Sequence, residues 1–546
     1  MALKRLTRQR KAILEVVRQA RHHPDAAWIY QEVRKRVPKV SLGTIYRNLE
    51  ALVAEGYLVP ITKAGEATRY DANLHPHHHL VCEACGAIVD LEVDLPDLRA
   101  LAREAHPGVE VREAEVTFKG LCPACKAAPK MSMDPLSWLS SRPRRFAPGL
   151  GRIRALLARL GHPEEAYPVA LVGGTNGKGT TARTLAAILE EAGFRVGLYT
   201  SPHLVDFRER IQVQGRPIPE EKLLALLAEL RPHAERLEAS FFEAATALAL
   251  LHFAREGVEF AVLEVGLGGR LDATNATEPV LSVVTNVGHD HLEVLGPTLK
   301  DVAREKAGIF RGGVPALTAA QGEGLGVLRA EALARKTPLW VLGEDFHAEG
   351  VEALPEGLAF TLRLERTGEA LRLTARLLGP HQAENLALAA LSGRLLGAGW
   401  EAVKRGVARA ENPGRLQRLL WRGRELLLDG AHNPEGALAL REALRFHGLL
   451  PAAFVLGFSR DKDHAAMAEA LRGLGPVVLT RYASLRSEDP RALLPLFPGA
   501  KVVEDPLEAL EEAFSREGRV VVAGSLYLVG EVLRRLEGLP AEERWQ

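Results

Sequence analysis

The stretch AYPVALVGGTNGKGTTARTLAAILEEAGFRVGLYTSPHL, residues 166–204, decides how most of the chain folds. Residues 169–172 predict a short buried strand, a glycine-rich turn follows, and residues 182–193 predict a helix that ends at a glycine. A strand, a glycine loop and a helix in this order cradle phosphate, because backbone N–H groups and the helix dipole bind anionic oxygens. Lys178 would reach the terminal phosphates. The stretch therefore predicts a nucleotide-binding α/β domain.

The glycine loop departs from the strict P-loop pattern, in which four residues separate two glycines and the second is followed by Lys and Ser or Thr. Only three residues separate Gly173 from Gly177, and Gly179 stands before Thr180. The bare pattern is therefore moderate evidence for phosphate binding. The flanking strand and helix are what favour it.

Strands and helices alternate through the rest of the chain. Apolar strand segments include FAVLEVGLG, LSVVTNVG and PALTAA, and after ARAENPGRLQ the alternation starts again with ELLLDGAHNP, AAFVLGFS, PVVLTRY and RVVVAGS. Such alternation predicts a parallel sheet with helices on both faces. We expect a P-loop-type α/β domain over residues 135–410, a smaller α/β domain over 411–546, and catalysis in the cleft between them.

The motifs of this region also carry a family resemblance. GTNGKGT, TSPHL, FFEAAT, EVGLGGRLDATN, GHDHLEVLG, REKAGI, RLQ and LDGAHNPEG occur in order between residue 135 and about residue 535. They resemble folylpolyglutamate synthase and dihydrofolate synthase, which are muramyl-ligase-like ATP-dependent amide ligases. The resemblance implies that the γ-phosphoryl group of ATP moves to a carboxylate of folate or dihydropteroate. The amine of L-glutamate then attacks the acyl phosphate.

The resemblance also implies site residues, each at a matching motif position. The implied ATP-binding residues are Thr175, Asn176, Gly177, Lys178, Gly179, Thr180, Asn385, Arg415 and Asp429. The implied Mg2+ ligands are Ser201, Glu264, His291 and Lys306. The implied folate-binding residues are Phe242, Glu243, Leu271, Asp272 and Ala273. The implied catalytic residues are Lys178, His291, Lys306, Asp429 and His432.

Two of these assignments have plain alternatives. Lys306 matches the position where the family carries a carbamylated lysine, whose carbamate offers an oxygen ligand to a metal. Without the resemblance, Lys306 reads as an ordinary lysine on a helix surface. His291 has a rival in His289, and the family's Gly-x-Asp-His spacing favours His291.

The first 72 residues predict a winged helix. Residues 1–50 contain twelve Lys and Arg against four acidic residues, which suggests a polyanion partner or a solvated helical surface. Three short amphipathic helices, the third capped by Ser41 or Thr44, precede a hairpin with a turn at Ala64 and Gly65. In a winged helix, the third helix lies in the major groove of DNA.

Residues 73–126 predict a small α+β domain that binds metal. All four cysteines of the chain lie in two Cys-x-x-Cys pairs, and four thiolates so spaced suit a structural Zn2+ ion: Cys82, Cys85, Cys122 and Cys125. His77 and His79 alternate along a predicted strand, so their imidazoles would share one face and a second metal. The alternative is an exposed histidine-rich loop.

Residues 1 to about 126 resemble the ferric uptake regulator family of metal-dependent repressors, and its peroxide-sensing branch in particular. The matching motifs are LTRQR…IL, HPDAAWIYQEV, VSLGTIYRNLEAL and H-x-H-x-x-C-x-x-C-G. The resemblance implies a homodimer on operator DNA, with residues 73–126 as the dimerisation domain, and an Fe2+ or Mn2+ site. The implied regulatory metal ligands are His23, Asp71, His77, His79 and Asp90. The implied DNA-binding residues are Tyr46 and Arg47, with Lys4 and Arg8 as weaker candidates.

Residues 127–134 predict a linker, and Met131 or Met133 looks like the former start of a separate gene. No apolar run approaches the 18 or so residues that a membrane span needs, and the charged N-terminus does not resemble a signal peptide, so we expect a cytoplasmic protein. The main hypothesis is a folate ligase, with one or both activities, fused to a repressor-like module. The alternatives are a non-catalytic nucleotide and metal sensor, or a ligase for muramyl substrates.

Overall fold

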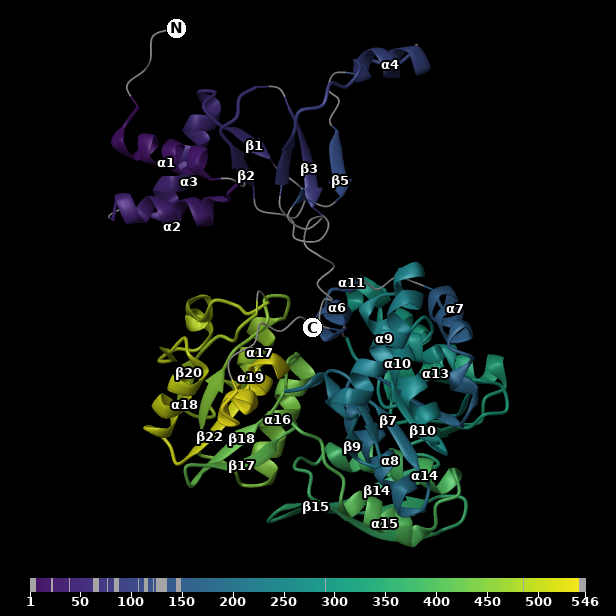
Figure 1. Ribbon diagram of the computed structural model, residues 1–546. Coiled ribbons are helices and arrows are strands. Elements are labelled where there is room, and N and C mark those ends of the chain that lie inside the picture. Colours follow the sequence, from purple (N-terminus) through teal and green to yellow (C-terminus); the bar gives the residue numbers. More distant parts are fainter. Residues whose placement is uncertain are drawn as a thin grey trace. The chain divides into compact units, whose positions relative to one another are not determined.

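The chain of 546 residues falls into two compact units in a computed structural model, Met1–Ser132 and Met133–Gln546 (Figure 1). The structure describes residues 6–20, 23–38, 40–61, 68–75, 77–82, 88–106, 108–111, 116–120, 122–123, 135–143, 149–289, 291–484 and 486–539. Several predicted features lie outside this part of the chain: Lys4, Cys85, Cys125, the turn at Ala64 and Gly65, and the linker 127–134 with Met131 and Met133. We call the two units the N-terminal unit and, after the family that its sequence resembles, the ligase unit.

The N-terminal unit begins with three helices and a hairpin. The helices are α1 (Arg8–Gln19), α2 (Ala26–Arg36) and α3 (Leu42–Ala54), and β1 (Val59–Ile61) pairs antiparallel with β2 (Arg69–Asp71). Each helix starts at a residue whose side chain accepts a hydrogen bond from the first turn: Thr7, Asp25 and Ser41. Of the two predicted caps of α3, Ser41 is the one used. Ile13, Ile29 and Ile45 are fully buried where the three helices meet.

A second sheet of the N-terminal unit has the order β4-β3-β5. Its strands are β3 (His78–Cys82), β4 (Ile88–Leu91) and β5 (Thr117–Gly120), and α4 spans Leu98–Ala105. β4 runs antiparallel and β5 parallel to β3, with His79 opposite Asp90. One expectation needs correction, because β3 begins at His78 and His77 lies just before the strand.

The ligase unit is built on an eight-stranded sheet with the order β13-β12-β11-β6-β10-β7-β8-β9. The strands are β6 (Val169–Gly173), β7 (Val196–Tyr199), β8 (Ile211–Val213), β9 (Arg216–Pro217), β10 (Phe260–Glu264), β11 (Pro279–Val284), β12 (Ala316–Thr318) and β13 (Leu339–Val341). The prediction of a parallel sheet holds for six strands. It is wrong at one edge, where β8 and β9 run antiparallel.

Helices cover both faces of this sheet. The helices of this part are α6 (Pro135–Ser140), α7 (Gly151–Arg159), α8 (Lys178–Glu191), α9 (Glu220–Arg236), α10 (Phe241–Arg255), α11 (Leu292–Leu295), α12 (Leu299–Ala307) and α13 (Gly322–Arg335). Alternate residues of β6 face the two layers: Val169 and Leu171 pack with α7, α9 and α10, and Ala170 and Val172 with α8. The strand is therefore apolar throughout, as a strand buried on both faces must be.

An antiparallel sheet that the sequence did not predict follows the main sheet. It consists of β14 (Phe346–Leu354), β15 (Gly357–Leu364) and β16 (Ala370–Ala375), followed by α14 (Gln382–Leu395) and α15 (Trp400–Ala408). Phe360 of β15 shares a core with Ile188 of α8 and Leu386 of α14. These elements pack against α8, the helix that follows the glycine loop.

The last part of the chain forms a six-stranded sheet, coloured green to yellow in Figure 1, with the order β17-β18-β22-β19-β20-β21. Its elements are β17 (Gln417–Trp421), β18 (Arg424–Leu428), α16 (Pro434–Phe446), β19 (Ala453–Leu456), α17 (His464–Leu471), β20 (Val477–Leu479), β21 (Lys501–Val502), α18 (Pro506–Phe514), β22 (Arg519–Ala523) and α19 (Leu526–Leu536). Only β17 is antiparallel. Helices pack on both faces, α16 and α17 on one and α18 and α19 on the other.

None of the helices in the described part of the chain is both long and apolar enough to cross a membrane.

Candidate active site and metal centre

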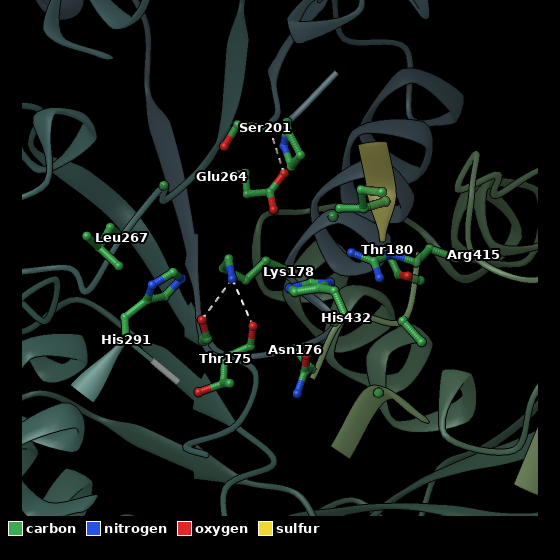
Figure 2. A pocket seen from close by; sticks show the side chains of 18 of the residues that line it. Thr175, Asn176, Lys178, Thr180, Ser201, Glu264, Leu267, His291, Arg415 and His432 are labelled. Carbon is green, nitrogen blue, oxygen red and sulfur yellow. Dashed lines mark hydrogen bonds between the residues drawn. The ribbon is translucent and has the colours of Figure 1, made fainter. Parts of the chain in front are cut away.

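One cavity of about 650 Å³ lies in the ligase unit and is lined by both of its α/β parts. Every residue predicted for ATP, Mg2+, folate or catalysis lines it. These residues are Thr175, Asn176, Gly177, Lys178, Gly179, Thr180, Ser201, Phe242, Glu243, Glu264, Leu271, Asp272, Ala273, His291, Lys306, Asn385, Arg415, Asp429 and His432. Figure 2 shows side chains from the loop after β6 and from α8 close to Arg415 and His432 from the last part of the chain.

The loop between β6 and α8 is fixed by hydrogen bonds to the end of β11. The Asn176 N–H donates to Asn286 Oδ1 at 2.9 Å, and the Gly288 N–H donates to Thr175 Oγ1 at 2.9 Å. The Thr285 hydroxyl donates to the Asn176 carbonyl at 2.6 Å. These contacts with the residues that follow β11 hold the loop in shape. The N-terminus of α8 lines the cavity.

Two positions in this loop require glycine. Gly177, directly before α8, has φ +84°, and a Cβ there would lie 2.1 Å from Asn385 Oδ1. Gly174 has φ +137°, and its Cβ would lie 1.8 Å from Thr285 Oγ1. Side chains at either position would be strained by the backbone and blocked by a neighbour. The loop backbone can thus come close to a bound phosphate.

Lys178 and Glu264 place opposite charges at the centre of the cavity (Figure 2). Lys178 Nζ donates to the carbonyls of Gly174 and Thr175, both at 3.0 Å. Glu264 Oε2 accepts from the Ser201 N–H at 3.0 Å. Burial raises the pKa of Glu264, and the positive charge of Lys178 opposes that rise. A carboxylate in such a place gains from a further cation.

The residues predicted to face folate differ in what their side chains do. Phe242 packs on the main chain of Gly266, where a Cβ would lie 2.4 Å from the ring. Asp272 instead uses both carboxylate oxygens on its own loop, accepting from the N–H groups of Gly266, Leu267 and Thr274 and from the Thr274 hydroxyl. Asp272 therefore shapes this wall of the cavity through its loop.

Glu243 is also committed to local structure. Its carboxylate accepts from the Ser240 N–H at 2.8 Å and closes a capping box at the start of α10. Arg152 donates to the same oxygen at 3.2 Å. Glu243 thus fixes the helix start that presents Phe241 and Phe242.

The two alternatives left by the sequence are separated by position. His291 lines the cavity, whereas His289 is exposed and is not among the lining residues. Lys306, in the last turn of α12, is only 4% exposed and lines the cavity. It is therefore not a surface lysine. No structural observation tests carbamylation, which stays a prediction.

The last α/β part of the chain reaches the same loop through polar side chains. Asn412 Nδ2 donates to Thr180 Oγ1 at 2.7 Å, and Asn433 Nδ2 donates to Asn176 Oδ1 at 3.3 Å. Asp429 accepts the N–H groups of Leu416 and Ala431, both at 2.8 Å, and burial raises its pKa against the charge of Arg415. These contacts draw both parts around the glycine loop.

The N-terminal unit holds a compact cluster of possible metal ligands. Five side chains each place one ligand atom within 4.8 Å of all the others: His23, Asp71, His77, His79 and Asp90. His23 Nε2 lies 3.0 Å from Asp90 Oδ1, and His77 Nε2 lies 3.0 Å from Asp71 Oδ2. These are the five residues that the sequence predicted for the regulatory metal.

The hydrogen bonds around the cluster orient its rings so that their Nε2 atoms face the carboxylates. His77 Nδ1 donates to the His75 carbonyl at 2.7 Å and His23 Nδ1 to the Ile88 carbonyl at 3.3 Å, because a carbonyl can only accept. With Nδ1 donating, each ring turns its Nε2 atom towards the carboxylates. Within the described residues, three buried atoms of the cluster have no hydrogen-bond partner: Asp71 Oδ2, His77 Nε2 and His79 Nε2. This donor set fits a cation.

Charges within the cluster act on its own histidines. Burial lowers the pKa of His23, but Asp71 and Asp90 outweigh burial and leave it raised. Burial, together with His23 and His77, lowers the pKa of His79. Asp71 has a lowered pKa, because its neighbours His23 and Asn73 outweigh its burial.

The other predicted sites of the N-terminal unit are described in part. Cys82 and Cys122 are buried, and the pairing of Cys82 with Gly120 places Cys122 two residues beyond the end of β5. Cys85 and Cys125 lie outside the described residues, so the predicted Zn2+ site is untested. Tyr46 and Arg47 are exposed on α3, and Arg8 is exposed at the start of α1.

Comparison with known proteins identifies both units. Residues 172–393 match the Mur ligase middle domain and residues 414–526 the Mur ligase, glutamate ligase domain. The chain is 38% identical over 432 residues to the dihydrofolate synthase/folylpolyglutamate synthase of Bacillus subtilis, covering 74% of this chain and 99% of that protein. The chain belongs to the folylpolyglutamate synthase and dihydrofolate synthase family. Residues 2–119 match the Ferric uptake regulator family, so the chain also carries a domain of that family.

Solved structures of this ligase family share the fold. The folylpolyglutamate synthase of Thermotoga maritima is 36% identical with a TM-score of 0.67, covering 75% of this chain and 97% of that one. The Mycobacterium tuberculosis folylpolyglutamate synthase, solved with ADP and AMPPCP, is 30% identical with the same TM-score, covering 72% of this chain and 96% of that one. The expected multidomain α/β ligase fold is thereby confirmed.

Sequence reasoning missed several polar residues that line the ligase cavity: Asn286, Asn412, Arg210, Lys462, Arg486 and Tyr527. Asn412 lies within the quoted segment ARAENPGRLQ, and Arg210 follows the quoted segment TSPHL by six residues, so proximity in sequence could have suggested both. Lys462 and Arg486 lie in loops after β19 and β20 and belong to no quoted motif. The common signal is position, because loops after parallel strands meet at one edge of a sheet.

Proposed function

We propose that the ligase unit joins L-glutamate to dihydropteroate or to a folate at the expense of ATP, through an acyl phosphate. One observation carries the proposal: a single cavity is lined by the glycine loop, by the Phe242 and Leu271 segments, and by Arg415 and Asp429 from the other α/β part. Phosphoryl donor and carboxylate acceptor can therefore meet in one place. Two independent sites would not allow the reaction.

The glycine loop and Lys178 would bind the triphosphate of ATP. Residues at the start of α8 line the cavity, and the backbone N–H groups of a helix N-terminus bind anionic oxygens. Lys178 lies 3.0 Å from two loop carbonyls and can turn from them to a phosphate, which is a stronger acceptor. Thr180, Asn385, Arg415, Asp429 and His432 would complete the nucleotide site.

Ser201, Glu264 and His291 would hold Mg2+, with Lys306 as a further ligand if carbamylated. A buried carboxylate with a hydroxyl beside it offers the oxygen atoms that Mg2+ prefers, and the positive charge would neutralise phosphate oxygens as they approach the acceptor. Glu264 fits this role. Burial raises its pKa, and the positive charges and the N–H group beside it oppose that rise only in part, so a bound cation would stabilise its charged form further.

The reaction then needs two displacements. A carboxylate oxygen of the acceptor attacks the γ-phosphorus, the bond to the bridging oxygen breaks, and ADP leaves. The amine of glutamate next attacks the acyl carbon, loses a proton to solvent, and expels inorganic phosphate. Lys178 stabilises the negative charge that these steps gather, while Phe242 and the loop held by Asp272 orient the acceptor.

The deciding assay measures ATP- and Mg2+-dependent incorporation of labelled glutamate with dihydropteroate and with tetrahydrofolate. We expect both acceptors to be used. Absence of turnover with either acceptor would overturn the enzyme proposal and favour a non-catalytic nucleotide sensor.

For the N-terminal unit we propose metal-dependent DNA binding by a winged helix. Exposed Tyr46 and Arg47 on α3 would contact bases, and Arg8 the backbone of the DNA, in a homodimer on an operator. The five-residue cluster would hold Fe2+ or Mn2+, because mixed nitrogen and carboxylate ligation suits either ion. A structural Zn2+ would be held by Cys82, Cys122 and the two other cysteines.

DNA binding can be tested with a duplex selected from a random pool by the full chain in Mn2+. Affinity should fall when Mn2+ is withdrawn and in His77→Ala, while His75→Ala, which changes a neighbouring exposed histidine outside the cluster, should bind like the wild type. Equal affinity with and without metal would contradict the regulatory proposal.

A further inference from the structure

Arg210 is a buried cation on the wall of the ligase cavity. It ends the short 3-10 helix Phe207–Arg210, directly before β8, and its carbonyl accepts the Thr200 N–H at 3.0 Å. The residue is only 4% exposed and yet lines the cavity. Its main chain is fixed by the sheet, so its side chain has a defined place.

Aromatic rings and one histidine hold the guanidinium of Arg210. Its Nε donates to His203 Nδ1 at 2.9 Å. Its Cζ lies 5.9 Å from the ring centre of Phe207 and 5.4 Å from that of Phe241. These contacts orient the planar group without neutralising its charge.

No carboxylate among the described residues lies within ion-pair distance of Arg210. The adjacent Glu209 uses its carboxylate to accept the N–H groups of Leu204, Val205 and Asp206, all between 2.7 and 2.8 Å. Glu264 accepts from Ser201. Burial lowers the pKa of Arg210, but an arginine stays charged in proteins. A buried charge without a counter-ion is costly, so the site gains when an anion enters.

The position of Arg210 indicates which anion this is. Phe241, against which the guanidinium lies, is followed by Phe242, which packs on Gly266 in the wall proposed for the aromatic rings of the acceptor. Glu264, one of the proposed Mg2+ ligands, lines the same cavity as Arg210. An acceptor with its rings beside Phe242 would bring its carboxylate towards Lys178 past this guanidinium.

We propose that Arg210 binds the carboxylate of the acceptor and holds it for attack on ATP. This inference rests on the proposed function and adds the residue that recognises the reacting end of the acceptor. A guanidinium offers two parallel N–H donors to a carboxylate, and its charge lowers the repulsion between the acceptor and the triphosphate. Arg210 thereby selects acceptors that end in a carboxylate.

The test compares two ligands on two proteins, in the full chain and without nucleotide. Binding of dihydropteroate and of its uncharged carboxamide is measured by titration calorimetry for the wild type and for Arg210→Gln. We expect the wild type to prefer the carboxylate by about tenfold to hundredfold, as charged hydrogen bonds allow. Arg210→Gln should lose most of this preference while binding the carboxamide as before. A preference retained in Arg210→Gln would overturn the proposal.

Arg208→Gln is the matched control, because Arg208 lies two residues away and pairs with Asp206 at 2.6 Å. It should keep the wild-type preference, and a loss as large as that in Arg210→Gln would contradict a specific role of Arg210. ADP binding shows that each variant is folded. If Arg210→Gln fails to bind ADP, Arg210→Lys replaces it in the test. Because lysine lacks the planar pair of donors, the ratio of carboxylate affinity to carboxamide affinity should be about tenfold smaller in Arg210→Lys than in the wild type. An unchanged preference in Arg210→Lys would overturn the proposal.

The outcomes also separate this inference from the proposed function. A wild type that binds neither ligand and incorporates no glutamate contradicts the proposed function itself. A wild type that turns over dihydropteroate but binds it no better than the carboxamide contradicts only the role of Arg210.

Discussion

The glycine loop of the ligase unit and the histidine–aspartate cluster of the N-terminal unit both bring polar groups together. The two sites differ in whether those groups have hydrogen-bond partners within the protein. At the loop, Lys178 donates to two loop carbonyls, and nearby Glu264, at the end of β10, accepts from Ser201. In the cluster, Asp71 Oδ2 and the Nε2 atoms of His77 and His79 are buried without hydrogen-bond partners, among the residues that the structure describes. The polar groups at the loop are satisfied by protein contacts, whereas the cluster has buried atoms whose only suitable partner would be a cation.

This difference separates two ways of building a ligand site. A loop whose groups already bond to one another keeps its shape while substrates come and go, as a catalytic site must. A cluster with unpaired buried atoms is stabilised strongly by its ligand, so binding changes the unit that holds it. We therefore expect changes at the loop to alter rates and changes at the cluster to alter the stability of the N-terminal unit.

The largest effect should follow Lys178→Met. Loss of this charge removes a group that stabilises the developing negative charge, and kcat should fall by about 10²–10³-fold. Release of ADP with dihydropteroate and glutamate measures it. Lys222→Met is the control, because Lys222 pairs with Glu256 outside the cavity. The contrast between the loop and the cluster would be contradicted if Lys178→Met kept the wild-type rate and instead lowered the stability of the N-terminal unit.

A slightly smaller effect is expected for Gly177→Ala. A side chain at φ +84° is strained, and its Cβ would lie 2.1 Å from Asn385 Oδ1, so nucleotide binding should weaken by about 3 kcal/mol. Titration with ADP measures the change. Gly151→Ala, at the start of α7 where a Cβ meets nothing within 4 Å, should bind as the wild type does. Equal ADP affinity in both variants would show that the loop shape is not needed.

The cluster is tested by adding Mn2+ to the full chain. With excess Mg2+ already present to fill the site proposed in the ligase unit, Mn2+ at a hundredfold excess over its dissociation constant should stabilise the N-terminal unit by about 2.7 kcal/mol and leave the ligase unit unchanged. Calorimetric scans of the two transitions measure this. His77→Ala should abolish the gain, and His75→Ala should keep it. A Mn2+ effect of equal size on both transitions would contradict the contrast between the two sites.

Some site residues could be predicted from the sequence alone, and others could not. Lys178 and Gly177 were predicted because a strand, a turn and a helix are local features. Lys306 was chosen only through family resemblance, since nothing in its local sequence signals that it is 4% exposed. Arg210 was missed because its importance depends on Phe241, which is 31 positions away and meets it only in the folded chain. The antiparallel edge of the main sheet was missed for the same reason.

The smallest effect concerns a histidine of the ligase core. His252 in α10 is 2% exposed, and burial is the main cause that lowers its pKa from 6.5 to about 4. The unfolded chain therefore takes up a proton as pH falls below about 6.5, while the folded chain does so only near 4. The ligase unit should lose about 1–2 kcal/mol between pH 6.5 and pH 5, and none above this range.

Urea unfolding of the wild type and of His252→Gln at pH 7 and pH 5 measures this loss. The stability difference between the two proteins should narrow at the lower pH. His233→Gln changes a half-exposed histidine in α9 and is the control. The stability difference between the wild type and His233→Gln should be the same at both pH values. An acid sensitivity that is unaltered in His252→Gln would assign the effect to other groups.

The central claim is that the cavity around Gly177 and Lys178 moves a phosphoryl group from ATP to a carboxylate. Dihydropteroate labelled with 18O in its carboxylate tests this directly, by mass spectrometry of the inorganic phosphate released when glutamate is joined. The account predicts one 18O atom in phosphate for each amide formed. Amide formation with unlabelled phosphate, or with the label in AMP, would contradict it.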